Sequence, residues 1–179
     1  MNLPNILTLL RLILIPIFIL IFFSSMSNSL IYSIAIFLLA GVTDFLDGYI
    51  ARKHKLVTKM GIVLDPLADK LMLMAVLTCL VIKAYIPLWV LLIICAKEIF
   101  MIFCGLFLYK KGTLIPSNKF GKATTILFYV SIFILGFNTT LGVYLLYISV
   151  AIAIVALVNY AIIYFNNKKT DDTSSTFKD

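Results

Sequence analysis

Residues 44–69 read DFLDGYIARKHKLVTKMGIVLDPLAD, which places four aspartates inside or beside apolar runs long enough to cross a lipid bilayer. An unpaired carboxylate near the bilayer centre costs about 2.5–3.5 kcal/mol on insertion scales, so four would cost on the order of 10 kcal/mol, as much as a domain's whole stability. Positive charge must therefore offset these acids, and neighbouring helices must bring them together. The aspartates are Asp44, Asp47, Asp65 and Asp69.

The rest of the chain is strongly apolar. Of its 179 residues, 63% are hydrophobic, and the mean hydropathy of +1.11 excludes a soluble domain of this size. Apolar runs of about the length of a spanning helix lie at 6–24, 30–50, 60–82, 87–109, 122–138 and 141–165. These runs do not alternate like the strands of a membrane barrel. The sequence therefore predicts an all-α integral membrane protein, a six-transmembrane-helix bundle in one domain over residues 1–165.

Basic residues cluster in two of the predicted connections, at 52–59 and 110–122. Because cytoplasmic loops are enriched in Lys and Arg, both clusters and both termini are predicted to face the cytoplasm. The net charge of +7 suits contact with anionic membrane lipids, and no nucleic-acid partner is expected. Residues 166–179, rich in Ser, Thr, Asp and Lys, are predicted to form a disordered cytoplasmic tail.

The four aspartates form two pairs, with spacings of three and four residues, so each pair shares one face of its helix. If the two helices pack antiparallel across their short connection, the carboxylates converge. Hard divalent cations prefer carboxylate oxygen, and two Mg²⁺ or Mn²⁺ ions would roughly balance the four negative charges. A pair of metal ions is a suitable seat for a diphosphate, so the pattern predicts phosphoryl-group transfer.

Two glycines and an arginine flank the acids and are predicted to bind the substrate that carries the diphosphate. Gly48 and Gly61 would let a ligand approach the backbone closely. Arg52 can bind a phosphate with its planar guanidinium group. For either glycine, close packing between membrane helices is an equally good explanation.

Residues 44–69 match, without gap or substitution, the signature D-x-x-D-G-x-x-A-R, eight residues, G-x-x-x-D-x-x-x-D, and so resemble the CDP-alcohol phosphotransferase family. The resemblance implies a six-helix, usually dimeric membrane enzyme that transfers a phosphatidyl or similar group from a CDP-linked donor to an alcohol and releases CMP. It also implies that Asp69 takes the proton from the acceptor hydroxyl. The implied metal ligands are Asp44, Asp47, Asp65 and Asp69, and the implied ligands of the cytidine diphosphate are Gly48, Ala51 and Arg52.

The first residues of the chain, 1–16, resemble the start of bacterial family members that use sn-glycerol 3-phosphate as the acceptor. Asn5, Thr8 and Arg11 are spaced three residues apart and form one polar stripe on a helix. The resemblance implies a short N-terminal interfacial segment that helps to bind the phosphates of the donor. An amphipathic membrane anchor is the alternative explanation.

Features of the predicted fourth and fifth helices resemble the same family members. Lys97 precedes Glu98 in the fourth apolar run, and Lys119 and Lys122 lie at the start of the fifth. A phosphate on the acceptor requires such cations, so the three lysines are predicted to bind it. Charge compensation between Lys97 and Glu98 inside the bundle is the alternative.

The expected function is transfer of a phosphatidyl group from CDP-diacylglycerol to sn-glycerol 3-phosphate by a homodimer in the bacterial cytoplasmic membrane, with the active site facing the cytoplasm. Serine, an inositol phosphate or phosphatidylglycerol as acceptor is the closest alternative. An ion or proton transporter would need polar groups that continue across the last two helices, and an intramembrane prenyltransferase would need more helices than 179 residues supply. A non-catalytic scaffold would not need four clustered acids.

Overall fold

The structure, a computed structural model, describes residues 3–54, 59–110 and 119–175. Within these ranges, side chains are described at 6–46, 48, 50, 64–65, 67–102, 123–159 and 161. The described residues form six helices joined by turns and no strand, namely α1 (Leu3–Phe22), α2 (Ser29–His54), α3 (Lys59–Ile82), α4 (Leu88–Lys110), α5 (Lys119–Leu135) and α6 (Thr139–Ser175). The prediction of an all-α chain with six helices is confirmed over this part of the sequence.

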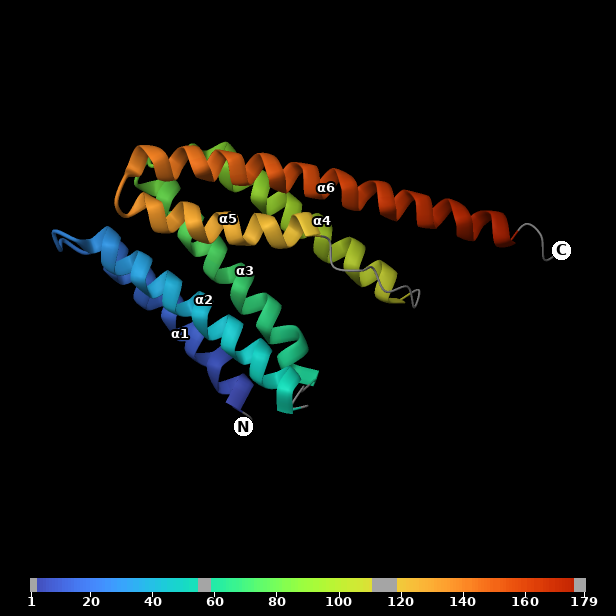
Figure 1. Cartoon of the computed structure of the whole chain (residues 1–179), viewed down its shortest axis with the longest axis horizontal. Helices are drawn as coiled ribbons and strands as arrows, with labels where there is room; N and C mark the ends of the chain where they lie inside the picture. Colours follow the sequence, from blue (N-terminus) through green and yellow to red (C-terminus); the bar gives the residue numbers. More distant parts are fainter. Residues whose placement is uncertain (1–2, 55–58, 111–118, 176–179) are drawn as a thin grey trace.

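The helices form two closely packed pairs that α3 and α4 connect. α1 packs against α2, and α5 packs against α6 (Figure 1). α3 contacts α1 and α2, whereas α4 contacts α3 and α6. The turns that join α1 to α2, α3 to α4 and α5 to α6 all lie on the left in Figure 1, and the C-terminal end of α6 lies far to the right. Successive helices therefore run back and forth between two ends of the molecule.

Two of these turns are stabilised by local hydrogen bonds. Asn138 caps α6, because its Oδ1 accepts a hydrogen bond of 3.1 Å from the Leu141 amide. α3 ends in a Schellman motif, in which the Tyr85 amide donates to the Leu80 carbonyl at 2.9 Å. Ala84 at this turn has a φ of 57°, the left-handed conformation that the motif requires. The sharp turn directs α4 back along α3.

Apolar side chains fill the interior and also cover much of the exterior. The largest fully buried apolar residues come from all six helices and include Phe18, Phe37, Leu77, Ile94, Ile132 and Leu146. On the outside, Leu20, Phe45 and Phe137 are 72%, 71% and 76% exposed. An apolar exterior of this kind indicates contact with lipid or with another protein. By length and composition, Ser29–Leu46 of α2 and Thr139–Asn159 of α6 are candidate membrane spans among the described residues.

Helices extend close to both ends of the described chain. The predicted N-terminal interfacial segment is the first part of α1, which runs unbroken from Leu3 to Phe22. Pro4 does not interrupt it, because the first turn of a helix needs no bond from that amide. The predicted disordered tail is helical as far as Ser175, since no glycine or proline follows Gly142 to end α6. Residues 176–179 lie outside the described chain.

Gly142 allows α5 and α6 to approach each other closely next to their turn. A Cβ atom at Gly142 would overlap the Cα of Leu135 and would lie 2.6 Å from its amide nitrogen. These are backbone atoms, so they cannot move aside without separating the helices. Farther along the same interface, the buried hydroxyls of Ser131 and Ser149 meet at 3.1 Å. Small residues and hydroxyl groups therefore hold this pair together.

We expect Gly142→Ala to destabilise the fold by about 1–3 kcal/mol, the usual cost of overpacking. The midpoint of thermal unfolding in detergent measures the loss. Gly136→Ala is the matched control, because the nearest atom to a Cβ there is the movable Cδ1 of Ile34, at 3.0 Å. Equal midpoints for the two variants would show that the close approach at Gly142 does not matter.

Candidate active site

Two members of the polar stripe of α1, Thr8 and Arg11, face inward, onto aspartates of α2 and α3. Arg11 is 1% exposed, and its Nη1 lies 2.8 Å from Oδ1 of Asp44. The same nitrogen donates a hydrogen bond of 3.3 Å to the main-chain oxygen of Asp65. One turn earlier, the buried hydroxyl of Thr8 donates to the Asp65 carboxylate. Thr8 and Arg11 therefore hold acids of two other helices and do not lie on an exposed face of α1.

Three of the four predicted metal ligands have described side chains, and they lie near one another. Asp44 is close enough to Asp65 and Asp69 for their negative charges to act on it. Within the described residues, no three acidic, histidine or cysteine side chains form a group that could hold a metal ion. The side chain of Asp47 lies outside this part of the structure. Carboxylate oxygens are the donors that Mg²⁺ and Mn²⁺ prefer, so the acids fit a divalent ion chemically.

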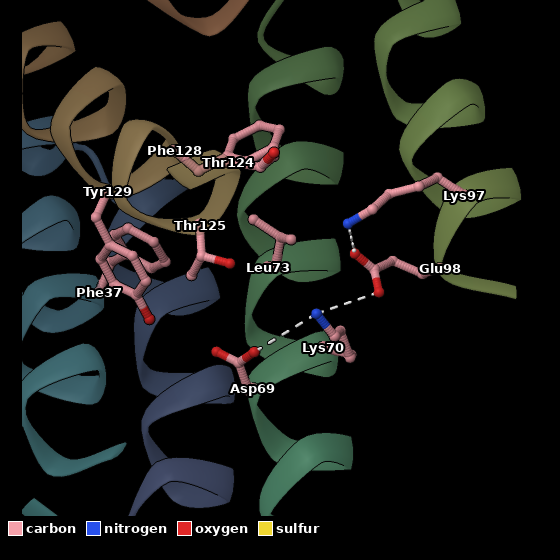
Figure 2. Close-up of a pocket in the computed structure, with 10 residues that line it drawn as sticks. All are labelled: Phe37, Asp69, Lys70, Leu73, Lys97, Glu98, Thr124, Thr125, Phe128 and Tyr129. Carbon is pink, nitrogen blue, oxygen red and sulfur yellow. Dashed lines mark hydrogen bonds and ion pairs between the residues drawn. The ribbon is translucent and has the colours of Figure 1, made fainter. Parts of the chain in front are cut away.

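Asp69, one turn beyond Asp65, lines a pocket between α3, α4 and α5 (Figure 2). The pocket encloses about 350 Å³, including its open mouth. Its polar lining consists of Asp69, Lys70, Lys97, Glu98, Thr124 and Thr125, and its apolar lining of Phe37, Leu73, Phe128 and Tyr129. The predicted base therefore borders a polar recess in an otherwise apolar bundle.

A pair of stacked aromatic rings forms one wall of this pocket. The rings of Phe37 on α2 and Tyr129 on α5 have centroids 4.5 Å apart and an angle of 15° between their planes. Gly41, one turn after Phe37, makes room for the Tyr129 ring, because a Cβ atom there would overlap it. The contact between α2 and α5 thus sets the shape of the recess on the side away from α4 (Figure 2).

A chain of charged side chains runs along the pocket from α3 to α4 (Figure 2). The Nζ of Lys70 lies 3.8 Å from Oδ2 of Asp69 and 3.1 Å from Oε2 of Glu98. The Nζ of Lys97 donates to Oε1 of Glu98 at 2.7 Å, and both residues are only 6% exposed. Lys97 is therefore engaged in the charge compensation that was the alternative explanation for it. Its binding of an acceptor phosphate stays a prediction.

Sequence reasoning missed Lys70, which follows Asp69 directly in the third apolar run. A lysine within an apolar run of this length was the available signal, because a lysine partly withdrawn from water requires an acidic partner. Gly48 lies on α2, four residues after Asp44 and so on the same face. Other predicted site residues have side chains outside the described structure, namely Asn5, Asp47, Ala51, Arg52, Gly61, Lys119 and Lys122.

Comparison with known proteins gives concordant matches. A family model described as CDP-alcohol phosphatidyltransferase matches residues 1–155. The chain is 40% identical over 137 residues to a protein of Rickettsia felis, and this aligned region covers 75% of the chain and 76% of the relative. It is 34% identical over 170 residues to a protein of Wigglesworthia glossinidia brevipalpis, and the match covers 89% of this chain and 93% of the relative. It is 38% identical over 136 residues to a protein of Bacillus subtilis, and that match covers 69% of this chain and 70% of the relative. All three relatives are named CDP-diacylglycerol–glycerol-3-phosphate 3-phosphatidyltransferase.

Replacing Arg11 tests whether its guanidinium holds the acids in place. Arg11→Met removes the charge and keeps a flexible apolar side chain, so the carboxylate of Asp44 and the main-chain oxygen of Asp65 lose a partner. We expect a loss of about 1–3 kcal/mol of stability, measured as a lower midpoint of thermal unfolding. Arg11→Lys keeps the charge and should recover part of the loss. A Met variant as stable as the unmodified protein would show that this contact is dispensable.

Proposed function

This chain belongs to the CDP-alcohol phosphatidyltransferase family, and we propose that it transfers the phosphatidyl group of CDP-diacylglycerol to sn-glycerol 3-phosphate, giving phosphatidylglycerophosphate and CMP. Relatives at 40% and 34% identity, which the match covers over most of their length, bear the name of that transferase. The observation that carries the proposal is the position of Asp69, which lies near Asp44 on one side and lines a polar pocket on the other.

Asp69 is the proposed general base. In the reaction, the oxygen of the acceptor hydroxyl forms a bond to the phosphorus of the phosphatidyl group, and the bond from that phosphorus to CMP breaks. The hydroxyl must also lose its proton. The Asp69 carboxylate lines the pocket and can accept this proton from an alcohol bound there. Asp44 and Asp65 are instead held by groups of α1, which supports a different role for them.

Members of this family generally depend on divalent metal ions. We assign four carboxylates as ligands of two Mg²⁺ or Mn²⁺ ions, those of Asp44, Asp47, Asp65 and Asp69. Such ions, when bound, neutralise the charge that develops on the diphosphate and on the departing CMP. Arg11 and Thr8 support this assignment, because they fix the carboxylates of Asp44 and Asp65 at the junction of three helices.

The donor is proposed to lie on the side of the acids that faces α1 and α2. We assign its nucleotide and diphosphate to Asn5, Thr8, Arg11, Gly48, Ala51, Arg52 and Gly61. Within this set, the buried Thr8 and Arg11 act by holding the acids in place, whereas the position of Gly48 on the face of Asp44 suits close approach of a ligand. Phe45, next to Asp44 and 71% exposed, offers an apolar surface to the acyl chains. The acceptor phosphate is assigned to Lys97, Lys119 and Lys122.

We further propose that all six helices cross the bacterial cytoplasmic membrane and that two copies form a homodimer. The exposed apolar side chains and the alternating turns support a multi-pass arrangement (Figure 1). The basic residues near 52–59 and 110–122 favour a cytoplasmic position for the active site and both termini. In this orientation a water-soluble acceptor reaches the pocket from the cytoplasm.

The activity assay follows directly. Purified protein in mixed micelles with CDP-diacylglycerol and radiolabelled sn-glycerol 3-phosphate should form labelled phosphatidylglycerophosphate and an equal amount of CMP. Removal of divalent ions with EDTA should reduce the rate to background, and added Mg²⁺ or Mn²⁺ should restore it. Labelled serine and inositol phosphate serve as control acceptors. Incorporation of one of these in place of glycerol 3-phosphate would reject the proposed acceptor.

The two roles of the aspartates can be separated by substitution. Asp69→Asn should lower kcat by about 10²–10⁴-fold and leave donor binding nearly intact, because it removes the base. Asp44→Asn should weaken binding of both the donor and the divalent ion. Donor binding is measured as protection of the protein against thermal unfolding by CDP-diacylglycerol with Mg²⁺. Small and equal effects of the two changes would contradict the separate roles.

A further inference from the structure

Lys70 presents its ammonium group to the pocket beside the proposed base. Its side chain is 33% exposed, compared with 8% for Lys97 on the facing helix. The bond to Glu98 is 3.1 Å long, a normal charge-assisted hydrogen bond, whereas the 3.8 Å separation from Asp69 is too long for one. Glu98 therefore fixes the position of Lys70, and Asp69 contributes weaker attraction.

Glu98 in turn is held from the other side by Lys97. The 2.7 Å bond from Lys97 and the 3.1 Å bond from Lys70 end on different oxygens of the same buried carboxylate. Lys70, Lys97 and Glu98 together carry a net charge of +1, with Asp69 not counted. Since Asp69 is assigned to the reaction itself, the excess positive charge remains for a ligand. An ammonium in a partly dry recess attracts a phosphate more strongly than one in water.

The lining of the recess indicates the chemistry of that ligand. Two ammonium groups and the hydroxyl-bearing residues Thr124 and Thr125 line it, and this lining suits a phosphate group better than an acyl chain. The hydroxyl-bearing residues Thr124 and Thr125 line the same space as Lys70 (Figure 2). A phosphate between Lys70 and these threonines would leave the rest of a three-carbon alcohol next to Asp69.

We propose that Lys70 binds the phosphate of the acceptor alcohol, with Glu98 and Lys97 as positioning residues that hold its ammonium group in the pocket. This inference rests on the proposed function and changes the assignment of Lys97, which acts through Glu98 and does not touch the ligand. It makes Lys70 a determinant of specificity for phosphorylated acceptors. A lysine that only neutralised Asp69 would instead affect turnover of every acceptor.

The test is a comparison of steady-state kinetics for lysine variants. Lys70→Met removes the charge and keeps the apolar stem, and it should raise KM for sn-glycerol 3-phosphate by about tenfold or more, with a much smaller change in KM for CDP-diacylglycerol. Lys70→Arg should restore most of the acceptor affinity. Lys83→Met is the matched control, because Lys83 follows the other end of α3 and lies over the Phe23 ring, 5.8 Å from its centroid.

A second measurement separates a ligand contact from a structural role. Inorganic phosphate should inhibit the unmodified enzyme competitively with glycerol 3-phosphate, and this inhibition should weaken in Lys70→Met and in the milder variant Lys70→Gln. A fall in kcat at constant acceptor KM, or a larger rise of that KM in Lys97→Met than in Lys70→Met, would overturn the inference. If neither Lys70 variant folds, failure of phosphate to compete with glycerol 3-phosphate in the unmodified enzyme would also overturn it. If the unmodified protein forms no phosphatidylglycerophosphate, the proposed function itself fails.

Discussion

The ion pair between Arg11 and Asp44 is the contact on which the arrangement of the site depends. Carboxylates among apolar helices repel one another, and each must find a positive partner or a hydrogen-bond donor. Arg11 serves two helices at once, because one nitrogen reaches the Asp44 carboxylate on α2 and the main chain of α3 at Asp65. The packing of α1 against α2 and α3 therefore has a polar component in a predominantly apolar interface.

α3 divides the site into two sides. Asp65 faces the hydroxyl of Thr8 on α1, Asp69 borders the pocket one turn later, and Lys70 reaches across to α4. A helix turns by about 100° per residue, so neighbouring positions point to different partners while positions four apart share a face. One short segment of α3 thus connects the proposed donor side, the proposed base and the proposed acceptor side, and Figure 2 shows the last two at Asp69 and Lys70. This connection explains why Asp69 and Lys70, which is paired with the Glu98 carboxylate, can be adjacent in the chain and still act on different groups.

The sequence predicted the number of helices and most of their ends, because apolar runs and intervening polar residues are local signals. The predicted third run, 60–82, ends where α3 ends, at Ile82. The rotation of each helix was harder to predict, since a helix that is apolar on all sides has no periodic pattern to show which face is inside. For that reason neither the inward orientation of Arg11 nor the role of Lys70 followed from spacing. At the C-terminus, a polar segment that lacks glycine and proline continues α6 to Ser175, a boundary that composition alone did not give.

The contact between Gly41 and the Tyr129 ring has a consequence for how acceptor preference can diverge among related enzymes. Gly41 has no functional group, yet its missing side chain admits the ring that bounds the pocket. A larger residue at this position would force the Tyr129 ring to tilt. The aromatic wall of the pocket would then change shape, while the charged groups on α3 and α4 kept their places. Substitution at a position that does not contact the ligand, such as Gly41, can therefore change acceptor selectivity. A comparison of ligand-contacting residues alone would not find the cause.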